Sequence, residues 1–452
     1  MPLLTVKRTR WLTFASALLL LLLYYYNIKP KFIARLLNSG ALRPPVLALA
    51  PGAGGNAVAE ARRKRSASLV WVLLGDPHFQ PYLLESVRQA RIFNQQELFF
   101  VVVDPNFFKW DHPWVAPLAK FRVRGWGARP APPALPRRGP LRRAAPPPPS
   151  TQPTAPPSPR RRPSSQPAQV VLVNYTTLQD PFVHDFEKNY QRLWDELGRK
   201  LGAMMQPTIN GKSNMEFTQV TMTRVVAVHQ VMLVFGVERV VHIENDQMIY
   251  GSIQRVARGA DACGVRLALT RLGIRMSYAT MFARDAASLK HMLDFILDTI
   301  SRGVDHAVKV VGSKWVTDMS LPAAYFERRA EAGDEWATTF PHAPDNSSCL
   351  SGASGFMFDA LPLGAWCCGS FEKPRKHLAV KMEESETKYW AGDFQWRVVD
   401  GDPDAGGRKV RRPFWNGAPV FNLHMHSKQL QLWRSDELQF PEAAFKLVKE
   451  RN

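Results

Sequence analysis

Short apolar runs that stop at an acidic turn, with longer helical stretches between them, constrain the fold of this chain most. The runs 69–74, 98–103 and 237–243 have the length of buried strands, and each is followed within two residues by Asp or Glu. The stretches 82–93 and 217–235 repeat apolar residues at helical spacing. Strand, helix and strand at this spacing predict an α/β fold with a mostly parallel, Rossmann-like sheet flanked by helices. The same patterns predict strands over 170–173, 266–269 and 278–282, a helix over 285–300 and a helix C-cap at Gly236.

Composition allows a large core and excludes several classes of protein. Apolar residues make up 45% of the 452 residues, which excludes a wholly disordered chain. The net charge of +20 is concentrated, because residues 122–162 contain ten Arg and no acid. Without that stretch the charge no longer favours a nucleic-acid-binding protein. Four Cys in a chain of this length exclude a scaffold built from disulfides.

An uncharged run of 18 residues, 11–28, predicts a transmembrane signal anchor. As a helix it would span roughly 27 Å, which suits the thinner membranes of the early secretory pathway. Residues 1–10 would then form a cytoplasmic tail, and the Ala-, Pro- and Gly-rich residues 29–67 a stem. Glycosylation sequons at Asn174 and Asn346 favour a lumenal location for the folded region. We therefore expect a single-pass type II protein of the Golgi or endoplasmic reticulum membrane; the alternative is a cleaved signal peptide.

The remainder of the chain divides into one folded region with an insert. Residues 68–435 carry the strand and helix patterns, and residues 436–452 are expected to be a C-terminal tail. The insert, 125–168, is a tract of Pro, Arg, Ala and Ser that cannot build a core. It interrupts folded sequence on both sides, which indicates a disordered exposed loop or a mistranslated intron.

Glu244 and Asp246 come directly after the apolar run 240–243 and carry the strongest chemical signal. Residues two apart on a strand point to the same face, so both carboxylates can converge just beyond the strand. Two carboxylates that close repel each other unless a cation lies between them. Oxygen ligands of this kind favour Mn²⁺ or Mg²⁺. Asp76 and Asp104 end the first two strands, and the carboxyl ends of parallel strands share one edge of a sheet.

A second polar group lies near the C-terminus, at His424, His426 and Lys428. In an extended segment these three side chains share a face. They offer imidazole nitrogens for a metal ion and an ammonium group for a phosphate. His242, in the strand before the acidic turn, is interpreted as a hydrogen-bonded packing residue.

Together these groups predict one chemical task. A cation held by Glu244, Asp246 and a C-terminal His would bridge a diphosphate. It would stabilise the negative charge that develops as the diphosphate leaves a sugar. Lys428 would add to that stabilisation.

An anchor, a stem, Glu-Asn-Asp after an apolar strand and a late His-x-His segment resemble the GT-A-type glycosyltransferases. In that family a short acidic motif, usually Asp-x-Asp, binds the metal and the nucleotide sugar; here Glu244 replaces the first Asp. The resemblance implies a GT-A-like catalytic domain, a nucleotide-sugar donor and a glycan or glycoprotein acceptor. It also implies these roles: Asp246 as principal metal ligand, Glu244 contacting the donor or a metal-bound water, His424 or His426 as a further metal ligand, and Asp76 and Asp104 near the nucleotide.

The acceptor side is represented by two candidate catalytic carboxylates. Asp393 lies between Trp390 and Trp396, whose rings could stack on a sugar, so it is a candidate base for the acceptor hydroxyl. Asp359 comes after the small residues 351–356, which are interpreted as a flexible loop over a ligand.

The cysteines suggest one disulfide. Cys349 is expected to pair with Cys367 or Cys368 in an oxidising lumen, and Cys263 to be buried and free.

Two other functions compete with a transferase. A membrane-tethered binding protein would work through its basic insert, 125–168. A metal-dependent hydrolase would use a centre built from His242, Glu244, Asp246, His424 and His426.

Overall fold

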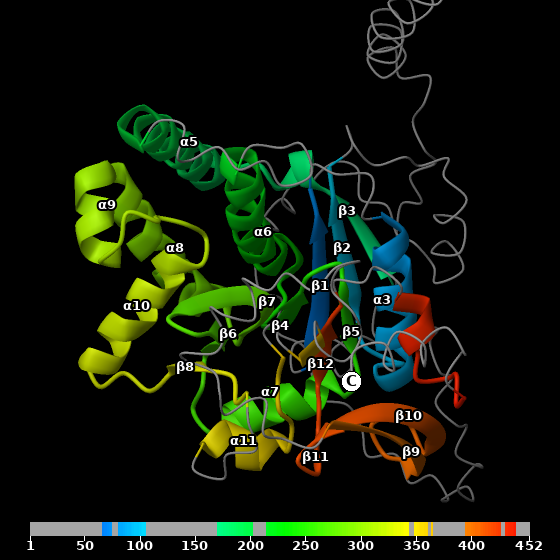
Figure 1. Cartoon of the computed structure of the whole chain (residues 1–452). Helices are drawn as coiled ribbons and strands as arrows, with labels where there is room; N and C mark the ends of the chain where they lie inside the picture. The colour runs from blue at the N-terminus through cyan, green and yellow to red at the C-terminus, as the bar shows by residue number, and fades with distance from the viewer. Residues whose placement is uncertain are drawn as a thin grey trace, which may run out of the picture. The chain divides into compact units, whose positions relative to one another are not determined.

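A seven-stranded sheet forms the centre of the protein, seen here in a computed structural model (Figure 1). Its strand order is β3-β2-β1-β4-β7-β6-β8. Every neighbouring pair is parallel except the two that involve β7. The predicted α/β fold with a mostly parallel sheet is therefore confirmed. The strands are β1 (Ala67–Leu73), β2 (Phe99–Val103), β3 (Val170–Asn174), β4 (Arg239–Ile243), β6 (Leu267–Leu272), β7 (Arg275–Ala283) and β8 (Ala337–Thr339).

The structure describes residues 66–74, 80–104, 170–201, 214–342, 348–359, 363–364, 394–425 and 430–439. The predicted cytoplasmic tail, anchor, insert and most of the stem and C-terminal tail lie outside these residues. No helix within the described ranges combines the length and the apolar character that a membrane span requires.

The central strands are buried on both faces. Val70 and Val72 of β1 point into one hydrophobic core, while Leu69, Trp71 and Leu73 point into the other. Successive side chains of a strand alternate between its faces, so a continuous apolar run is the pattern that a sheet covered on both sides requires.

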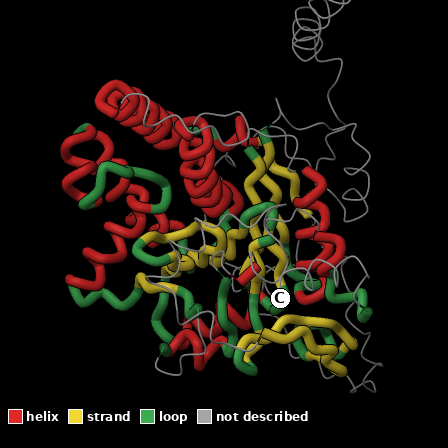
Figure 2. The backbone as a smooth tube through the Cα atoms, in the orientation of Figure 1, coloured by secondary structure: helices red, strands yellow, loops and turns green. Residues whose placement is uncertain are grey.

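Helices cover both faces of the sheet (Figure 2). One core packs against α5, α6, α8, α9 and α10, and the other against α3, α7 and α11. The bounds on the first side are α5 (Pro181–Leu201), α6 (Asn214–Phe235), α8 (Ala286–Ser301), α9 (Val304–Val311) and α10 (Ser320–Glu331). On the second side they are α3 (Gln80–Phe93), α7 (Ile253–Ala262) and α11 (Cys349–Ser354). The described residues also contain two 3₁₀ turns, η2 (Tyr175–Leu178) and η4 (Leu430–Trp433).

Two helix ends coincide with capping residues in the sequence. Gly236 comes after α6 with φ of 62°, a conformation that favours glycine, and confirms the predicted C-cap. Asp285 caps α8, because its carboxylate accepts a hydrogen bond from the backbone N–H of Ser288 at 2.7 Å.

Two small sheets accompany the large one in the part of the chain that the structure describes. The first is an antiparallel set in the order β11-β10-β9. The second joins β5 and β12, the two strands next to the acidic turn and the late His-x-His segment. Their bounds are β5 (Gln247–Ile249), β9 (Phe394–Asp402), β10 (Arg408–Trp415), β11 (Ala418–Pro419) and β12 (Asn422–His424).

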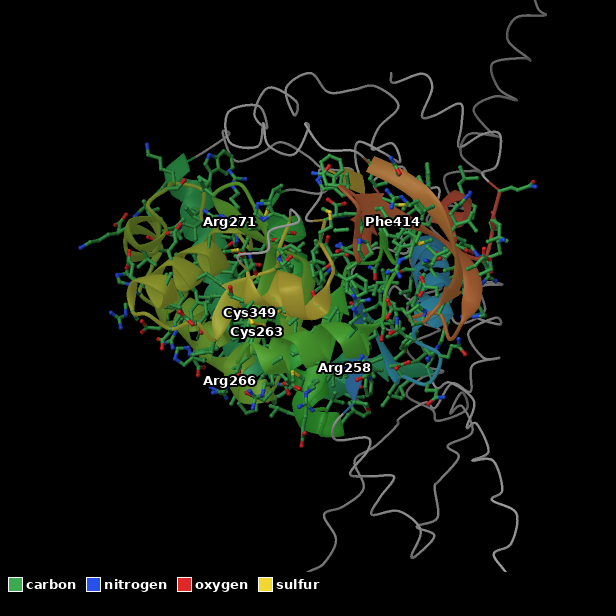
Figure 3. All side chains as sticks on the ribbon, turned by 90° about the horizontal axis from the view of Figure 1, so that it is seen from below. Arg258, Cys263, Arg266, Arg271, Cys349 and Phe414 are labelled. Atoms are coloured by element: carbon green, nitrogen blue, oxygen red, sulfur yellow. A yellow bond between two sulfur atoms is a disulfide. The ribbon has the colours of Figure 1, made fainter. Side chains whose placement is uncertain are left out.

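The expected disulfide pairing is wrong. Cys349 pairs with Cys263, across 86 residues of sequence and with 5.8 Å between the two Cα atoms (Figure 3). Cys263 caps the C-terminus of α7 and Cys349 begins α11, so the bond joins two helices that pack together. Cys367 and Cys368 lie outside the described residues.

The small residues 351–356 are not the expected flexible loop. Residues 351–354 belong to α11, which packs closely on α7. A Cβ added at Gly259 of α7 would lie 2.9 Å from the backbone nitrogen of Ser354. Small side chains are needed here because two helices approach each other, not because a loop must move.

Candidate metal centre

The topology of the sheet places the acidic turn at a switch point. From β1 the chain adds β2 and then β3 on one side, and returns to place β4 on the other side of β1. Ligands of open α/β sheets bind at the carboxyl edge where the strand order reverses. Glu244 comes after the last residue of β4, Ile243, and so lies at this edge.

A turn, rather than an extended strand, brings the two carboxylates together. The backbone N–H of Gln247 donates to the carbonyl of Glu244 at 3.3 Å, which closes a turn between β4 and β5. The backbone N–H of Met425 donates to the carbonyl of Asp246 at 2.8 Å. This contact aligns β12 with the turn, and His424 pairs with Gln247 in the antiparallel register.

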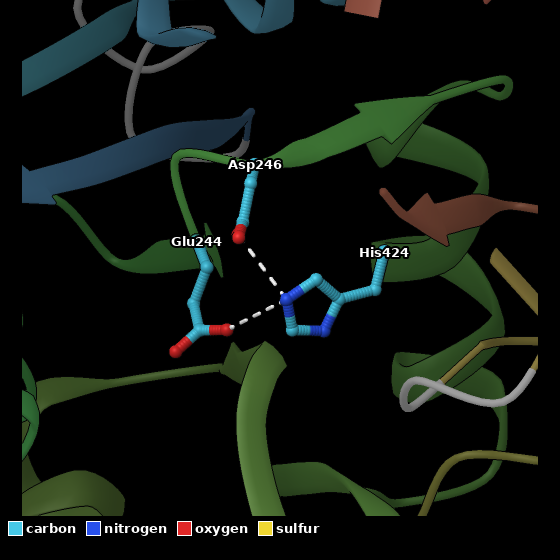
Figure 4. Close-up of side chains that lie close together, drawn as sticks. All are labelled: Glu244, Asp246 and His424. Carbon is cyan, nitrogen blue, oxygen red and sulfur yellow. Dashed lines mark ion pairs between the residues drawn. The ribbon is translucent and has the colours of Figure 1, made fainter. Parts of the chain in front are cut away.

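Glu244, Asp246 and His424 converge at one point (Figure 4). The Nε2 atom of His424 lies 3.2 Å from Oδ1 of Asp246 and 3.5 Å from Oε2 of Glu244. One ligand atom from each of the three residues lies within 4.8 Å of the other two. The side chains are partly buried, with exposed fractions of 20% for Glu244, 16% for Asp246 and 9% for His424.

The electrostatics of the cluster favour a positive charge at its centre. Burial opposes protonation of His424, but the charge and hydrogen bond of Asp246, with the charge of Glu244, outweigh it and raise the pKa of His424 to about 9. A site with this charge would favour a divalent cation. Two carboxylates and one imidazole suit Mn²⁺ better than Mg²⁺, because Mg²⁺ requires oxygen ligands and imidazole is a common ligand of first-row transition metals.

Arg224 of α6 contacts the cluster and was missed from the sequence. Its Nη1 atom lies 3.3 Å from Oε1 of Glu244, so the two oxygens of that carboxylate face different partners. The one sequence signal for this role is a charged residue directly before the apolar stretch 225–228 of a buried helix.

Asp318 is a buried acid that the charges of Glu244 and Arg224 influence. Burial raises its pKa to about 6; a hydrogen bond with Thr221 acts against this rise, the Glu244 charge adds to it, and the Arg224 charge opposes it. The cluster is therefore rich in negative charge, with Arg224 as its neighbouring cation on α6. The sequence around Asp318 carries no signal that could have placed it here.

His242 is a packing residue, as predicted. Its Nδ1 lies 3.0 Å from the carbonyl oxygen of Val70 on the neighbouring strand β1, and its ring is fully buried. Burial lowers the pKa of His242 to about 3. It therefore does not join Glu244 and Asp246 in the centre that the hydrolase hypothesis required.

Asp104 lies at the carboxyl edge of the sheet, at the end of β2. Its backbone N–H donates to the carbonyl of Leu73 at 3.3 Å. Its charge adds to the burial and the Glu187 contact that raise the pKa of Tyr175. Four other predicted site residues lie outside the described residues: Asp76, Asp393, His426 and Lys428.

Asp359 is not arranged as a base. Its side chain is 2% exposed, and both carboxylate oxygens accept hydrogen bonds from backbone N–H groups. Burial raises the pKa of Asp359, while the N–H groups of His424 and Gly364 act to lower it. The expected acceptor-side aromatic Trp396 stacks on Trp433 at 5.7 Å between ring centroids and is partly buried against a hydrophobic core.

A cavity of about 600 Å³ lies elsewhere, beside the disulfide. Cys263, Cys349 and the edge strand β8 contribute to its lining, and the three residues of the candidate metal centre do not. It therefore adds nothing to the chemistry of that centre.

Comparison with known proteins gives little. No protein family matches the chain, and no curated protein matches it. Among solved structures, the chain is similar to the galactosyltransferase LgtC in complex with donor and acceptor sugar analogs. The two are 10% identical, the alignment covers 84% of this chain and 99% of the other, and the TM-score is 0.35. A TM-score that low carries no argument about activity.

Proposed function

We propose that this chain is a metal-dependent glycosyltransferase that moves a sugar from a nucleotide-sugar donor to a glycan or glycoprotein acceptor. The observation that carries the proposal is the convergence of Glu244, Asp246 and His424 at the carboxyl edge of a mostly parallel sheet, at its switch point. Such an edge accommodates a nucleotide, and the three side chains supply a centre for the cation that a diphosphate needs. The fold is of the kind expected for a GT-A-like enzyme.

The three ligands have distinct tasks. Asp246 and Glu244 supply carboxylate oxygens, and His424 supplies Nε2 after losing its proton. Mn²⁺ held there would act as a Lewis acid toward the departing diphosphate. Arg224 contacts the second oxygen of Glu244, which holds that carboxylate in place.

Location in the secretory pathway is part of the proposal. It rests on the uncharged run 11–28, which would anchor the chain in a Golgi or endoplasmic reticulum membrane. The catalytic region would then face the lumen, where glycan and glycoprotein acceptors occur. The Cys263–Cys349 disulfide is compatible with an oxidising compartment.

A nucleotide-release assay tests the proposal. The full chain is incubated with Mn²⁺ and a panel of nucleotide sugars, with and without a mixture of glycan acceptors. We expect metal-dependent release from one donor class, and its loss in Asp246→Asn. Asp298→Asn removes an exposed acid of α8 and should behave as wild type. Turnover that persists in Asp246→Asn or in excess chelator would contradict the proposal, and metal-dependent hydrolysis of substrates without a nucleotide would favour a hydrolase.

A further inference from the structure

Asp359 forms hydrogen bonds with the first and last residues of β12, Asn422 and His424. Its Oδ2 atom accepts hydrogen bonds from the backbone N–H of His424 at 3.0 Å and of Gly364 at 2.7 Å, and its Oδ1 accepts from Leu363 at 3.0 Å. Its backbone N–H and carbonyl bond the side-chain amide of Asn422, at 3.2 and 2.7 Å. A carboxylate is suited to this position because it accepts several hydrogen bonds and donates none.

Asn422 extends this network to the turn that carries the acids. Its Nδ2 atom also donates to Oε1 of Gln247 at 3.1 Å, and that oxygen accepts from the hydroxyl of Thr280 on β7 at 2.9 Å. Gln247 is the residue directly after Asp246. All three side chains are buried, so hydrogen bonds broken here would not be replaced by water without a cost.

The network fixes the register between β5 and β12. Among the described residues their ladder has three residue pairs: Asn422 with Ile249, Leu423 with Met248 and His424 with Gln247. A slip by one residue would turn every side chain of β12 to the opposite face. The imidazole of His424 would then leave Glu244 and Asp246.

Gly364 closes the other side of this arrangement. A Cβ at this position would lie 2.4 Å from the carbonyl oxygen and 2.7 Å from the nitrogen of His424. Its backbone thus packs directly against the backbone of the candidate ligand. Any larger residue at position 364 would force either β12 or the backbone at position 364 to move.

We propose that Asp359 is a positioning residue: by holding the backbone of His424 and the amide of Asn422, it sets the register that directs the imidazole toward Glu244 and Asp246. This inference rests on the proposed function, since metal binding is the task for which the imidazole is placed. Asp359 touches neither metal nor substrate in this role. It acts through the backbone of His424.

Mn²⁺ binding to the full chain tests this role, measured from the loss of the free-ion electron paramagnetic resonance signal. We expect Asp359→Asn to raise the dissociation constant of Mn²⁺ roughly tenfold or more, because its amide must place an N–H₂ against a backbone donor. The matched control is Asp402→Asn. Asp402 is equally buried, accepts from the backbone of Asp404 and Ala405 and pairs with Arg412, but lies in the β9–β10 hairpin. The Asp402→Asn variant should be less stable than wild type but bind Mn²⁺ with an affinity within about twofold of wild type.

Gly364→Ala provides a second route if Asp359→Asn does not fold, and it should weaken Mn²⁺ binding in the same direction. Far-UV circular dichroism identifies variants that are folded at the assay temperature. Folded Asp359→Asn or Gly364→Ala protein with wild-type Mn²⁺ affinity would overturn the positioning role while leaving the proposed function intact. A wild-type chain that binds no Mn²⁺ would overturn both. Weakened Mn²⁺ binding in the variants of a chain that transfers no sugar would support the positioning role and contradict only the transferase.

Discussion

Breaking the Cys263–Cys349 disulfide should destabilise the protein by several kcal/mol. The bond closes a loop of 86 residues between α7 and α11. In the chain-entropy model a loop of that length restricts the unfolded chain enough to contribute about 4–5 kcal/mol at 25 °C. The loop of about 18 residues expected from the sequence, between Cys349 and Cys367 or Cys368, would contribute roughly 3 kcal/mol.

Single variants distinguish the two pairings. We expect Cys263→Ser to lower the free energy of unfolding in urea by about 4–5 kcal/mol, and Cys349→Ser to do the same, with no further loss in the double variant. If Cys349 instead paired with Cys367 or Cys368, Cys263→Ser would cost only the packing of one small side chain. Peptide mapping under non-reducing conditions reports the same point directly. A Cys349 peptide linked to any cysteine other than Cys263 would refute the reasoning.

Three further predictions concern stability. Arg224→Met should lower the free energy of unfolding in urea titrations by about 2 kcal/mol at pH 7, because it leaves Glu244 without its Arg partner. Saturating Mn²⁺ should recover part of this loss. His229 is buried, and burial lowers its pKa to about 4, so the free energy of unfolding should fall as pH drops from about 6.5 toward 4, because the unfolded state takes up the proton first. In urea titrations across this range, the decline for His229→Leu should be smaller by up to about 3 kcal/mol. An unchanged decline would contradict the lowered pKa of His229. Gly259→Ala should cost about 1–3 kcal/mol in urea titrations, because the added Cβ would meet the backbone of Ser354, and a neutral result would show that α11 can move away.

The sequence predicted local structure well because periodicity is a local property. The buried strands β1 and β2 contain unbroken apolar runs, and α6 is a long, largely apolar stretch with a glycine after its last turn. Each of these signals lies within one segment of the chain. The sheet between them could be inferred from the spacing of strand, helix and strand.

Contacts between distant segments were harder to predict. The sequence marked Glu244, Asp246 and His424 as candidate ligands, but only the pairing of β5 with β12, about 175 residues apart, shows how they meet. The Cys263–Cys349 pair failed for the same reason, because proximity in sequence favoured a wrong partner. The role expected for Asp359 was wrong for another reason: the sequence does not show the backbone N–H groups that surround its carboxylate.

The most direct test of the metal centre is the anomalous scattering of Mn²⁺ in crystals of the protein grown with Mn²⁺. A difference map recorded near the manganese absorption edge should show one strong peak within coordination distance of Glu244, Asp246 and His424. Asp246→Asn crystals under the same conditions should lose it. A wild-type map with no peak at these residues, or with its strongest peak bound by other side chains, would contradict the account.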